Sequence, residues 1–140
     1  MAFNEQMQVS MLPVLTQVEA TTGDVFTWIP KKSMLIRDIG VVLTELVALN
    51  TTDCLVSFDH TNTAGGVVRA EKAEFTITEA DALGTEFLAS VDATAAFVPF
   101  VVEAGDTVFV EQKQQGVDGD SATGAYRIVL YYEWIPDGKS

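Results

Sequence analysis

The chain has 140 residues, of which 48% are hydrophobic and 9% aromatic, enough for one domain with a substantial core. Its 20 acidic and 8 basic side chains give a formal charge of −12, and Lys31 and Lys32 are its only adjacent cations, so we expect no nucleic-acid-binding surface. No apolar run approaches the ~20 residues of a membrane-spanning helix, so we expect no membrane segment.

Residues 1–13 are predicted to form an extended N-terminal arm, followed by a single β-sandwich domain over residues 14–140. The arm scatters apolar side chains among polar ones, and Pro13 closes it. Its apolar residues favour docking against another surface, with a frayed terminus or a simple edge strand as the alternative.

Residues 14–19 and 25–29 are short extended runs on either side of a Thr-Thr-Gly-Asp turn, and we predict that they pair as a hairpin. Residues 34–49 have an apolar spacing that also suits a helix. Their β-branched side chains and the central Gly40 instead favour a long strand with a bulge. We expect this strand to form a second hairpin with residues 54–58.

The composition of residues 60–66 predicts a loop, and residues 73–78 form the next predicted strand. Residues 79–83 are expected to make one helical turn, capped by Thr78 and ended by Gly84. Residues 87–91 and 97–102 are predicted as two further strands.

The clearest strand pattern lies between residues 101 and 134, where two extended segments flank a linker rich in Gly, Asp and Ser. Period-two alternation places one face of these segments in a core, and this face carries Phe97, Val101, Val108, Val110, Ile128, Leu130 and Tyr132. About eight short strands without a long helix predict an all-β fold of two antiparallel sheets packed as a sandwich. A jelly roll is the first choice and an immunoglobulin-like sandwich the second.

Residues that carry chemistry are few. Cys54 is the only cysteine, so an intrachain disulfide is impossible. Its apolar context predicts a buried or half-buried thiol, with a reactive thiol as the alternative. His60 is the only histidine and is expected in a surface loop, which disfavours a zinc site or a Ser-His-Asp triad. We therefore predict no catalytic residues, no metal and no cofactor.

Three other readings remain open. Paired strand carboxylates would suit a glycosidase, but alternating acids on strands usually form the solvated face of a sheet. A loop containing Asp118 and Asp120 would suit calcium, but its composition is also that of an exposed turn. Trp28 and Trp134 would suit a sugar platform, whereas core packing and a subunit contact explain the aromatic residues more simply.

Four features occur together along the chain: the N-terminal arm, a strand after Trp28-Ile29-Pro30, the Ala104-Gly105-Asp106-Thr107-Val108 turn into a strand, and a closing strand over residues 123–134. In this combination the sequence resembles the small jelly-roll decoration, or cement, proteins of tailed-phage heads. The resemblance implies a non-enzymatic structural virion protein. Such a protein binds the outer capsid surface in many copies and strengthens the lattice against internal pressure.

The resemblance also implies the major capsid protein as partner and a homo-oligomer, with a trimer favoured. It implies synthesis in the host cytoplasm and a final location on the outer capsid surface of the virion. The predicted capsid or subunit interface consists of apolar residues from the arm and the closing strand: Phe3, Met7, Val9, Met11, Leu12, Tyr131 and Trp134. The alternative function is a carbohydrate- or receptor-binding module of a phage tail or cell-surface assembly.

Overall fold

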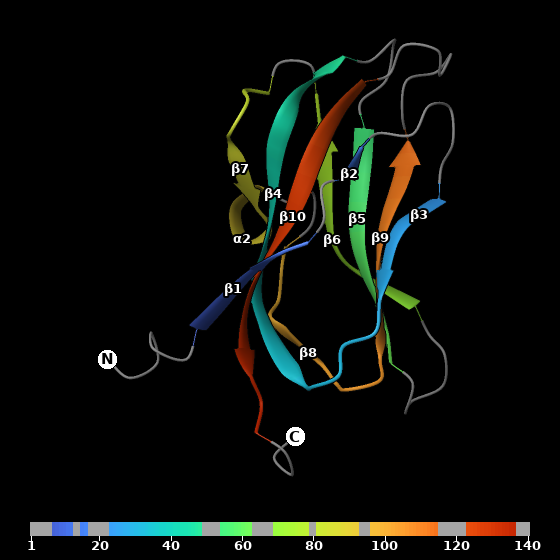
Figure 1. Cartoon of the computed structure of the whole chain (residues 1–140), viewed down its shortest axis with the longest axis vertical. Coiled ribbons are helices and arrows are strands. Elements are labelled where there is room, and N and C mark those ends of the chain that lie inside the picture. Colours follow the sequence, from blue (N-terminus) through green and yellow to red (C-terminus); the bar gives the residue numbers. More distant parts are fainter. Residues whose placement is uncertain are drawn as a thin grey trace.

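A computed structural model describes residues 7–12, 15–16, 23–48, 54–62, 69–78, 81–92, 96–114 and 123–136. These residues form two antiparallel sheets that pack as a sandwich, which confirms the predicted all-β fold class (Figure 1). The helix within the described ranges is the single turn α2 (Ala89–Asp92). No helix in this part of the chain is long and apolar enough to cross a bilayer.

The first sheet, sheet A, runs in the order β1-β10-β4-β7, with β2 also paired to β10 and β8 also paired to β4. Its strands are β1 (Met7–Met11), β2 (Leu15–Thr16), β4 (Met34–Ala48), β7 (Glu86–Leu88), β8 (Phe100–Val102) and β10 (Thr123–Trp134). The second sheet, sheet B, runs in the order β3-β9-β5-β6. Its strands are β3 (Gly23–Trp28), β5 (Cys54–Thr61), β6 (Arg69–Ile77) and β9 (Thr107–Gln114).

The antiparallel strand pairs are nested along the chain. β5 pairs with β6, β4 with β7 and β8, β3 with β9, and β1 with β10. The first half of the chain therefore runs alongside the second half as one long ribbon. Consecutive strands such as β3 and β4, or β9 and β10, lie in opposite sheets.

This alternation between sheets overturns two local predictions. Residues 15–16 and 23–28 do not form a hairpin, because β2 pairs with β10 and β3 pairs with β9. β4 and β5 are not a hairpin either, because β4 belongs to sheet A and β5 to sheet B. A turn signal reports that the chain reverses, but the same reversal can carry it to the other sheet.

The long strand predicted over residues 34–49 is confirmed as β4. Its register against β10 shifts opposite Tyr131–Tyr132 and again near Ala125, on either side of Gly40 rather than at it. The helical turn predicted from residue 79 is not found in the part of that segment the structure describes, which carries a turn at Leu83–Gly84. A helical turn lies later, at α2, and overlaps the strand predicted over residues 87–91, of which only Phe87 and Leu88 belong to a strand, β7.

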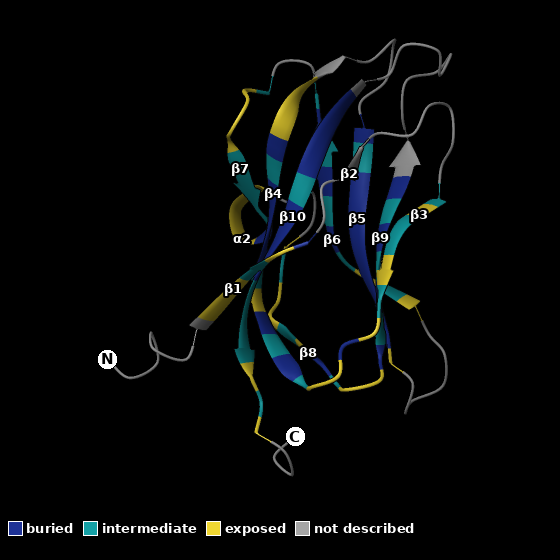
Figure 2. Ribbon diagram, viewed as in Figure 1, coloured by how far each residue is buried: buried dark blue, intermediate teal, exposed yellow. Residues whose placement is uncertain are grey.

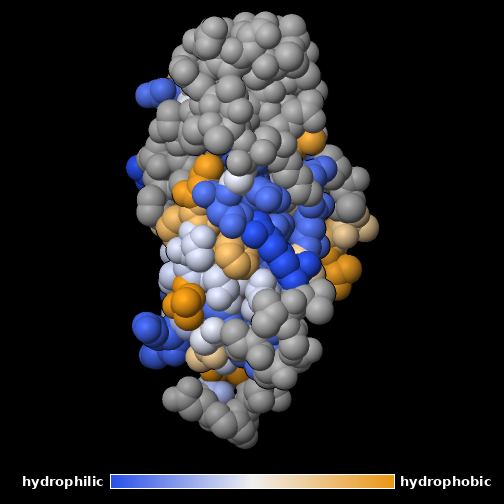
Figure 3. Space-filling view, turned by 90° about the vertical axis from the view of Figure 1, so that its right-hand side faces the viewer, coloured by the Kyte–Doolittle hydropathy of each residue, from blue (hydrophilic) through white to orange (hydrophobic). Residues whose placement is uncertain are grey.

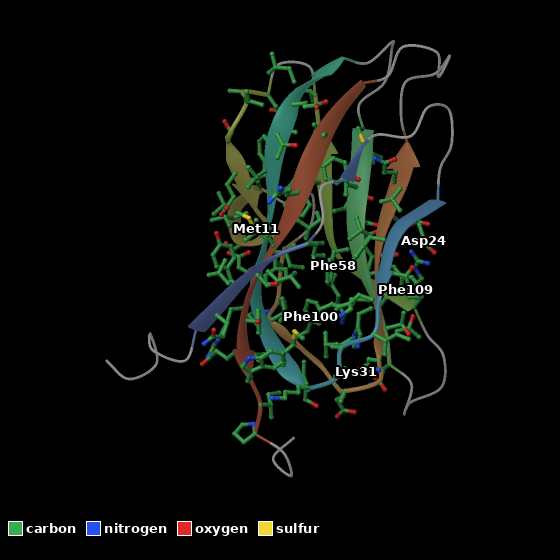
Figure 4. All side chains as sticks on the ribbon, in the orientation of Figure 1. Met11, Asp24, Lys31, Phe58, Phe100 and Phe109 are labelled. Atoms are coloured by element: carbon green, nitrogen blue, oxygen red, sulfur yellow. The ribbon has the colours of Figure 1, made fainter. Side chains whose placement is uncertain are left out.

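The core is formed by buried residues on strands of both sheets (Figure 2). Its largest fully buried side chains include Tyr126, Phe58, Phe75, Met34, Ile36 and Leu130. Phe58 from sheet B lies against Phe100 from sheet A with ring centroids 6.3 Å apart (Figure 4). Each such side chain contributes roughly 1.5–3 kcal/mol by leaving water.

The predicted inward face of the last strands is confirmed for Val108, Val110, Ile128 and Leu130, which are all buried. Phe97 and Tyr132 are partly buried and pack against the core. The prediction for Val101 is wrong, because Val101 is exposed whereas its neighbour Val102 is fully buried. The strand β8 has only three residues, which is too short for periodicity to fix which side faces inward.

Candidate binding face

Apolar side chains form a patch on the outer side of sheet A, beside the charged Arg37, Asp38, Glu86 and Arg127. We call this patch the A face: Val9, Met11, Leu88, Val129 and Tyr131. Ile128 and Leu130 are buried in the core, so Val129 and Tyr131 between and beside them point outward. The strand register places Val9 opposite Tyr131 and Met11 opposite Val129. Directly opposed residues share one side of an antiparallel pair, so β1 extends this apolar surface to the edge of the sheet.

The β1 residues of the A face are strongly exposed. Val9 retains 58% and Met11 57% of their possible accessible surface. Val129, beneath them, is 1% exposed although it points away from the core. The Met11 sulfur accepts a hydrogen bond from Arg127 at 3.7 Å, which holds its side chain across the face.

Gly40 shapes the middle of the A face. It lies on β4 between Val129 of β10 and Leu88 of β7. The Tyr131 hydroxyl donates to both oxygens of Glu86, at 2.6 and 3.0 Å, although β4 separates their strands. A Cβ on residue 40 would lie 3.1 Å from the Glu86 Cδ, so the absence of a side chain at Gly40 leaves room for this contact.

The bond to Glu86 also alters the acidity of Tyr131. Deprotonation of the phenol would remove the donated proton and place two negative charges together. The pKa of Tyr131 is raised to about 12, first by this hydrogen bond, then by burial and by the charges of Glu86 and Asp38. The phenol is therefore a neutral donor at physiological pH.

A shallow pocket of about 410 Å³ lies in the A face, lined by Arg37, Asp38, Leu88 and Tyr131. Its charged groups already have partners. Asp38 accepts hydrogen bonds from the Ser90 hydroxyl and from the backbone of Ile39 and Ser90, and Arg37 pairs with Glu133. The pocket therefore has an apolar and aromatic floor, and its rim carries one ion pair and one hydrogen-bonded carboxylate.

The predicted interface residues are divided by the structure. Val9, Met11 and Tyr131 come together on the A face, whereas Leu12 turns inward and is buried. Trp134 lies beyond the core, 44% exposed, with its ring 5.0 Å from that of Tyr132. The Met7 backbone pairs with Glu133. Phe3 and the Met7 side chain fall outside the described residues.

Gly40, Glu86 and Leu88 were missed from the sequence. Glu86 and Leu88 belong to a three-residue strand whose pattern is too short to show a face. Only the register between β4 and β7 brings them beside Tyr131. The mid-strand glycine was the one available signal, since a glycine inside a strand often marks a close approach.

The outer side of sheet B is polar, and we call it the B face: Asp24, Ser57, Asp59, Arg69 and Glu111. Arg69 donates to Asp59 at 2.7 Å and to both oxygens of Asp24 at 2.6 and 3.1 Å, with Glu111 at 3.8 Å. Its guanidinium also lies 4.2 Å from the centre of the Phe109 ring. Figure 3 shows a hydrophilic band across this side of the molecule, and Figure 4 places Asp24 and Phe109 there.

His60 is not on a surface loop as predicted. It lies in β5, is buried, and contacts Asp106 through its Nε2 at 2.8 Å. Asp106 also accepts the Glu103 amide at 2.9 Å, so the pair fastens the turn before β9 to β5. The hydrogen bond to Asp106 offsets the free-energy cost of burying the polar imidazole ring. Asp106 lies 46 positions away, so no local sequence pattern indicates this partner.

Cys54 is buried as predicted, and burial raises the pKa of its thiol to about 12. The thiol is therefore protonated and poorly nucleophilic at neutral pH. Across the described ranges, no group of three or more His, Cys, Asp or Glu side chains is placed to hold a metal ion. The Asp118 and Asp120 loop lies outside those ranges.

No protein-family model matches this sequence, and no curated protein matches it. The contrast between the A face and the B face is therefore the basis for a functional conclusion.

Proposed function

We propose that the protein is a non-enzymatic capsid decoration, or cement, protein that binds the outside of a phage head through the A face. The observation that carries this proposal is the difference in polarity between the outer surfaces of the two sheets. The A face presents exposed Val9 and Met11 beside Tyr131, whereas the B face is covered by ion pairs around Arg69. A protein that coats a lattice needs one adhesive side and one solvated side.

The nested strand pairing supports a jelly roll as the finer description of the fold. A jelly roll arises when a long antiparallel ribbon is rolled into two sheets, so that strands from the two chain halves pair from the ends inward. The pairs β1 with β10, β3 with β9, β4 with β8, and β5 with β6 follow that scheme. This is also the fold that the sequence resemblance implies.

The chemistry of the A face suits a protein partner. Interface cores are enriched in Tyr and Met and depleted of charged residues. Met11 and Tyr131 match this composition, and Val9 lies opposite Tyr131 on β1. Burying the exposed parts of Val9 and Met11 would add hydrophobic stabilisation at about 25 cal/mol per Å². The acidic remainder, with its net charge of −12, keeps the free protein soluble before assembly.

The partner in this proposal is the major capsid protein, and the location is the outer capsid surface. Many copies bind one head, as a homo-oligomer for which the resemblance favours a trimer. The ion pair of Arg37 with Glu133 and the hydrogen bond that Asp38 accepts from the Ser90 hydroxyl form the polar rim of the contact. Rim charges of this kind set orientation more than affinity.

The test is co-sedimentation of the purified protein with undecorated heads. Leu88→Asp places a charge in the A face, away from β1, and is expected to weaken binding about tenfold or more, equivalent to about 1.4 kcal/mol. Thr27→Asp adds the same charge to an exposed position of β3 in sheet B and is the matched control. Equal binding by wild type and Leu88→Asp, or no binding by wild type, would refute the proposal.

A carbohydrate-binding module is the second candidate, and one observation favours it. Trp134 is exposed, packs edge-on against Tyr132 and has the Lys32 ammonium 5.8 Å from its ring centre. An exposed indole is a typical sugar platform. Glycan-array binding that is lost in Trp134→Ala but kept in Leu88→Asp would favour this function over the decoration function.

A further inference from the structure

The four sheet edges differ in how they are protected from pairing with another chain. Charges, bulges, proline and short strands are the usual protection of an edge. On β6, four of the nine residues are charged, and β3 carries Asp24 and a register shift beside it. β7 and β8 have three residues each. The charged residues of β6 are Arg69, Glu71, Lys72 and Glu74.

β1 lacks charges, bulges and proline, and it is longer than β7 and β8. Its five residues, Met-Gln-Val-Ser-Met, contain no charge and no proline, and they pair with β10 one for one without a register shift. They lie in the 13-residue stretch 6–18, which has no charged residue in a chain of net charge −12. Among the described residues, no strand pairs with the outer edge of β1.

The backbone of β1 is oriented to receive another strand. The Leu12 amide donates to the Ile128 carbonyl at 2.9 Å, so it points toward β10. The backbone N–H and C=O groups of successive residues in a strand point alternately to its two edges. Those of Ser10 therefore also point toward β10, and those of Val9 and Met11 point to the outer edge. These groups are the donors and acceptors of a potential new ladder.

The sequence of β1 is self-complementary. In an antiparallel pair of two β1 strands centred on Val9, Val9 faces Val9 of the second copy and Met7 faces Met11. Gln8 then faces Ser10, so apolar residues oppose apolar ones and polar residues oppose polar ones. A two-fold contact requires a surface of this kind, because each position must tolerate its own partner in the other copy.

We propose that β1 pairs antiparallel with β1 of a second copy of this chain, about a two-fold axis at Val9, and joins the two A sheets into one continuous sheet. The uncharged stretch allows two acidic molecules to approach at this edge. A single pair of five-residue strands is a small interface, so the dimer is in concentration-dependent equilibrium with monomer. The contact closes after two copies, so it is distinct from the trimer that the resemblance favours on the head. It uses the backbone edge of β1 and leaves the outward side chains of the A face in place.

Sedimentation velocity over a wide range of concentrations tests this contact. The wild type should shift from monomer to dimer as concentration rises. Val9→Lys and Val9→Asp each place two like charges opposite one another, so each should weaken the dimer about tenfold or more. An equimolar mixture of the two variants should recover the dimer, because lysine then faces aspartate.

Val98→Lys is the matched control, since Val98 is exposed and lies in the connection before β8. It should dimerise like the wild type. Equal melting temperatures of the Val9 and Val98 variants would show that β1 still docks on β10. Hydrogen exchange at the Val9 and Met11 amides should slow as the dimer forms.

Each other outcome would overturn the proposal. A wild type that stays monomeric at every concentration shows that the edge does not self-associate. An oligomer that survives Val9→Lys uses another surface. Single variants that dissociate without recovery in the mixture contradict the two-fold register at Val9. Head binding can succeed or fail in any of these cases, so the two proposals are tested separately.

Discussion

The outer surfaces of the two sheets differ, although the inner surfaces are alike. Both sheets turn Val, Ile and Phe side chains into one core, as Val41 does from sheet A and Phe58 from sheet B. Outward, sheet A presents Val9, Met11 and Tyr131, whereas sheet B presents Arg69 held among carboxylates. The core therefore specifies the sandwich, and the proposed head-binding surface rests on the difference between the outer faces.

The two faces also use ion pairs differently. On the B face, the Asp59 side chain is only 6% exposed, and its Oδ2 accepts the bond from Arg69 while its Oδ1 has no partner. On the A face, Arg37 is 46% exposed and pairs with Glu133 at the rim. The first pair neutralises a nearly buried carboxylate, whereas the second joins a half-exposed Arg37 to a Glu133 side chain that is 14% exposed.

Arg69→Ala is expected to give the largest effect. It removes the guanidinium from a buried Asp59 carboxylate and should lower the free energy of unfolding by about 2–3 kcal/mol. This is less than the 3–5 kcal/mol typical of a fully buried pair, since Arg69 itself is one-third exposed. Urea unfolding followed by fluorescence measures the change.

The double variant Arg69→Ala, Asp59→Ala is the control for that measurement. Removing the stranded carboxylate as well should return part of the lost stability. A loss below about 0.5 kcal/mol in Arg69→Ala would mean that Asp59 is effectively solvated, and the contrast between the two faces would then not extend to their energetics.

Much of the fold follows from the sequence because side-chain alternation depends only on local geometry. Val108, Val110, Ile128 and Leu130 were assigned inward, and all are buried. The pairing of strands is harder to predict from the sequence. The sequence of residues 50–53 predicts a hairpin turn, but β5 belongs to the other sheet. Which sheet receives a strand depends on long-range packing that a turn does not encode.

The candidate site is predictable only in part, for a related reason. Val9, Met11 and Tyr131 were identified because apolar and aromatic residues at exposed ends suggest contacts. Gly40 and Glu86 could not be identified, since the contact of Glu86 with Tyr131 crosses an intervening strand. His60 was wrongly predicted in a surface loop, because its partner in the buried pair, Asp106, is distant in the sequence.

Gly40→Ala tests how closely the A face is packed and should have the next largest effect. The new methyl group would lie 3.1–3.2 Å from the Glu86 side chain and would push it away from Tyr131. Loss of a hydrogen bond to a charged group, partly offset by the stiffer unfolded chain, predicts a net destabilisation of about 1 kcal/mol. A more stable Gly40→Ala variant would show that Glu86 moves without loss.

The pH dependence of the A face gives a smaller signal. The pKa of Tyr131 is about 12 in the folded protein, above the ordinary tyrosine value of about 10. Folding therefore favours the protonated phenol, so this contribution to stability is complete below about pH 10 and is lost as the pH rises through about 12.

Ultraviolet titration of tyrosinate, with Tyr131→Phe to assign the transition, measures that pKa. Glu86→Gln removes the charged acceptor and should lower the pKa of Tyr131 toward 10. An unchanged titration in Glu86→Gln would mean that Glu86 does not hold the hydroxyl in solution.

Arg37→Ala is the smallest expected effect and the closest counterpart of Arg69→Ala. The Arg37 side chain is nearly half exposed, so loss of its pair with Glu133 should cost about 0.5 kcal/mol or less in urea unfolding. The same variant should nevertheless weaken binding to phage heads if the A face is the contact, because a rim charge that contributes little to folding still steers association and sets orientation. Arg69→Ala should show the reverse: a large loss of stability with unchanged head binding below its unfolding transition. Equal effects of the two variants on both measurements would mean that adhesion and solvation are not divided between the two faces.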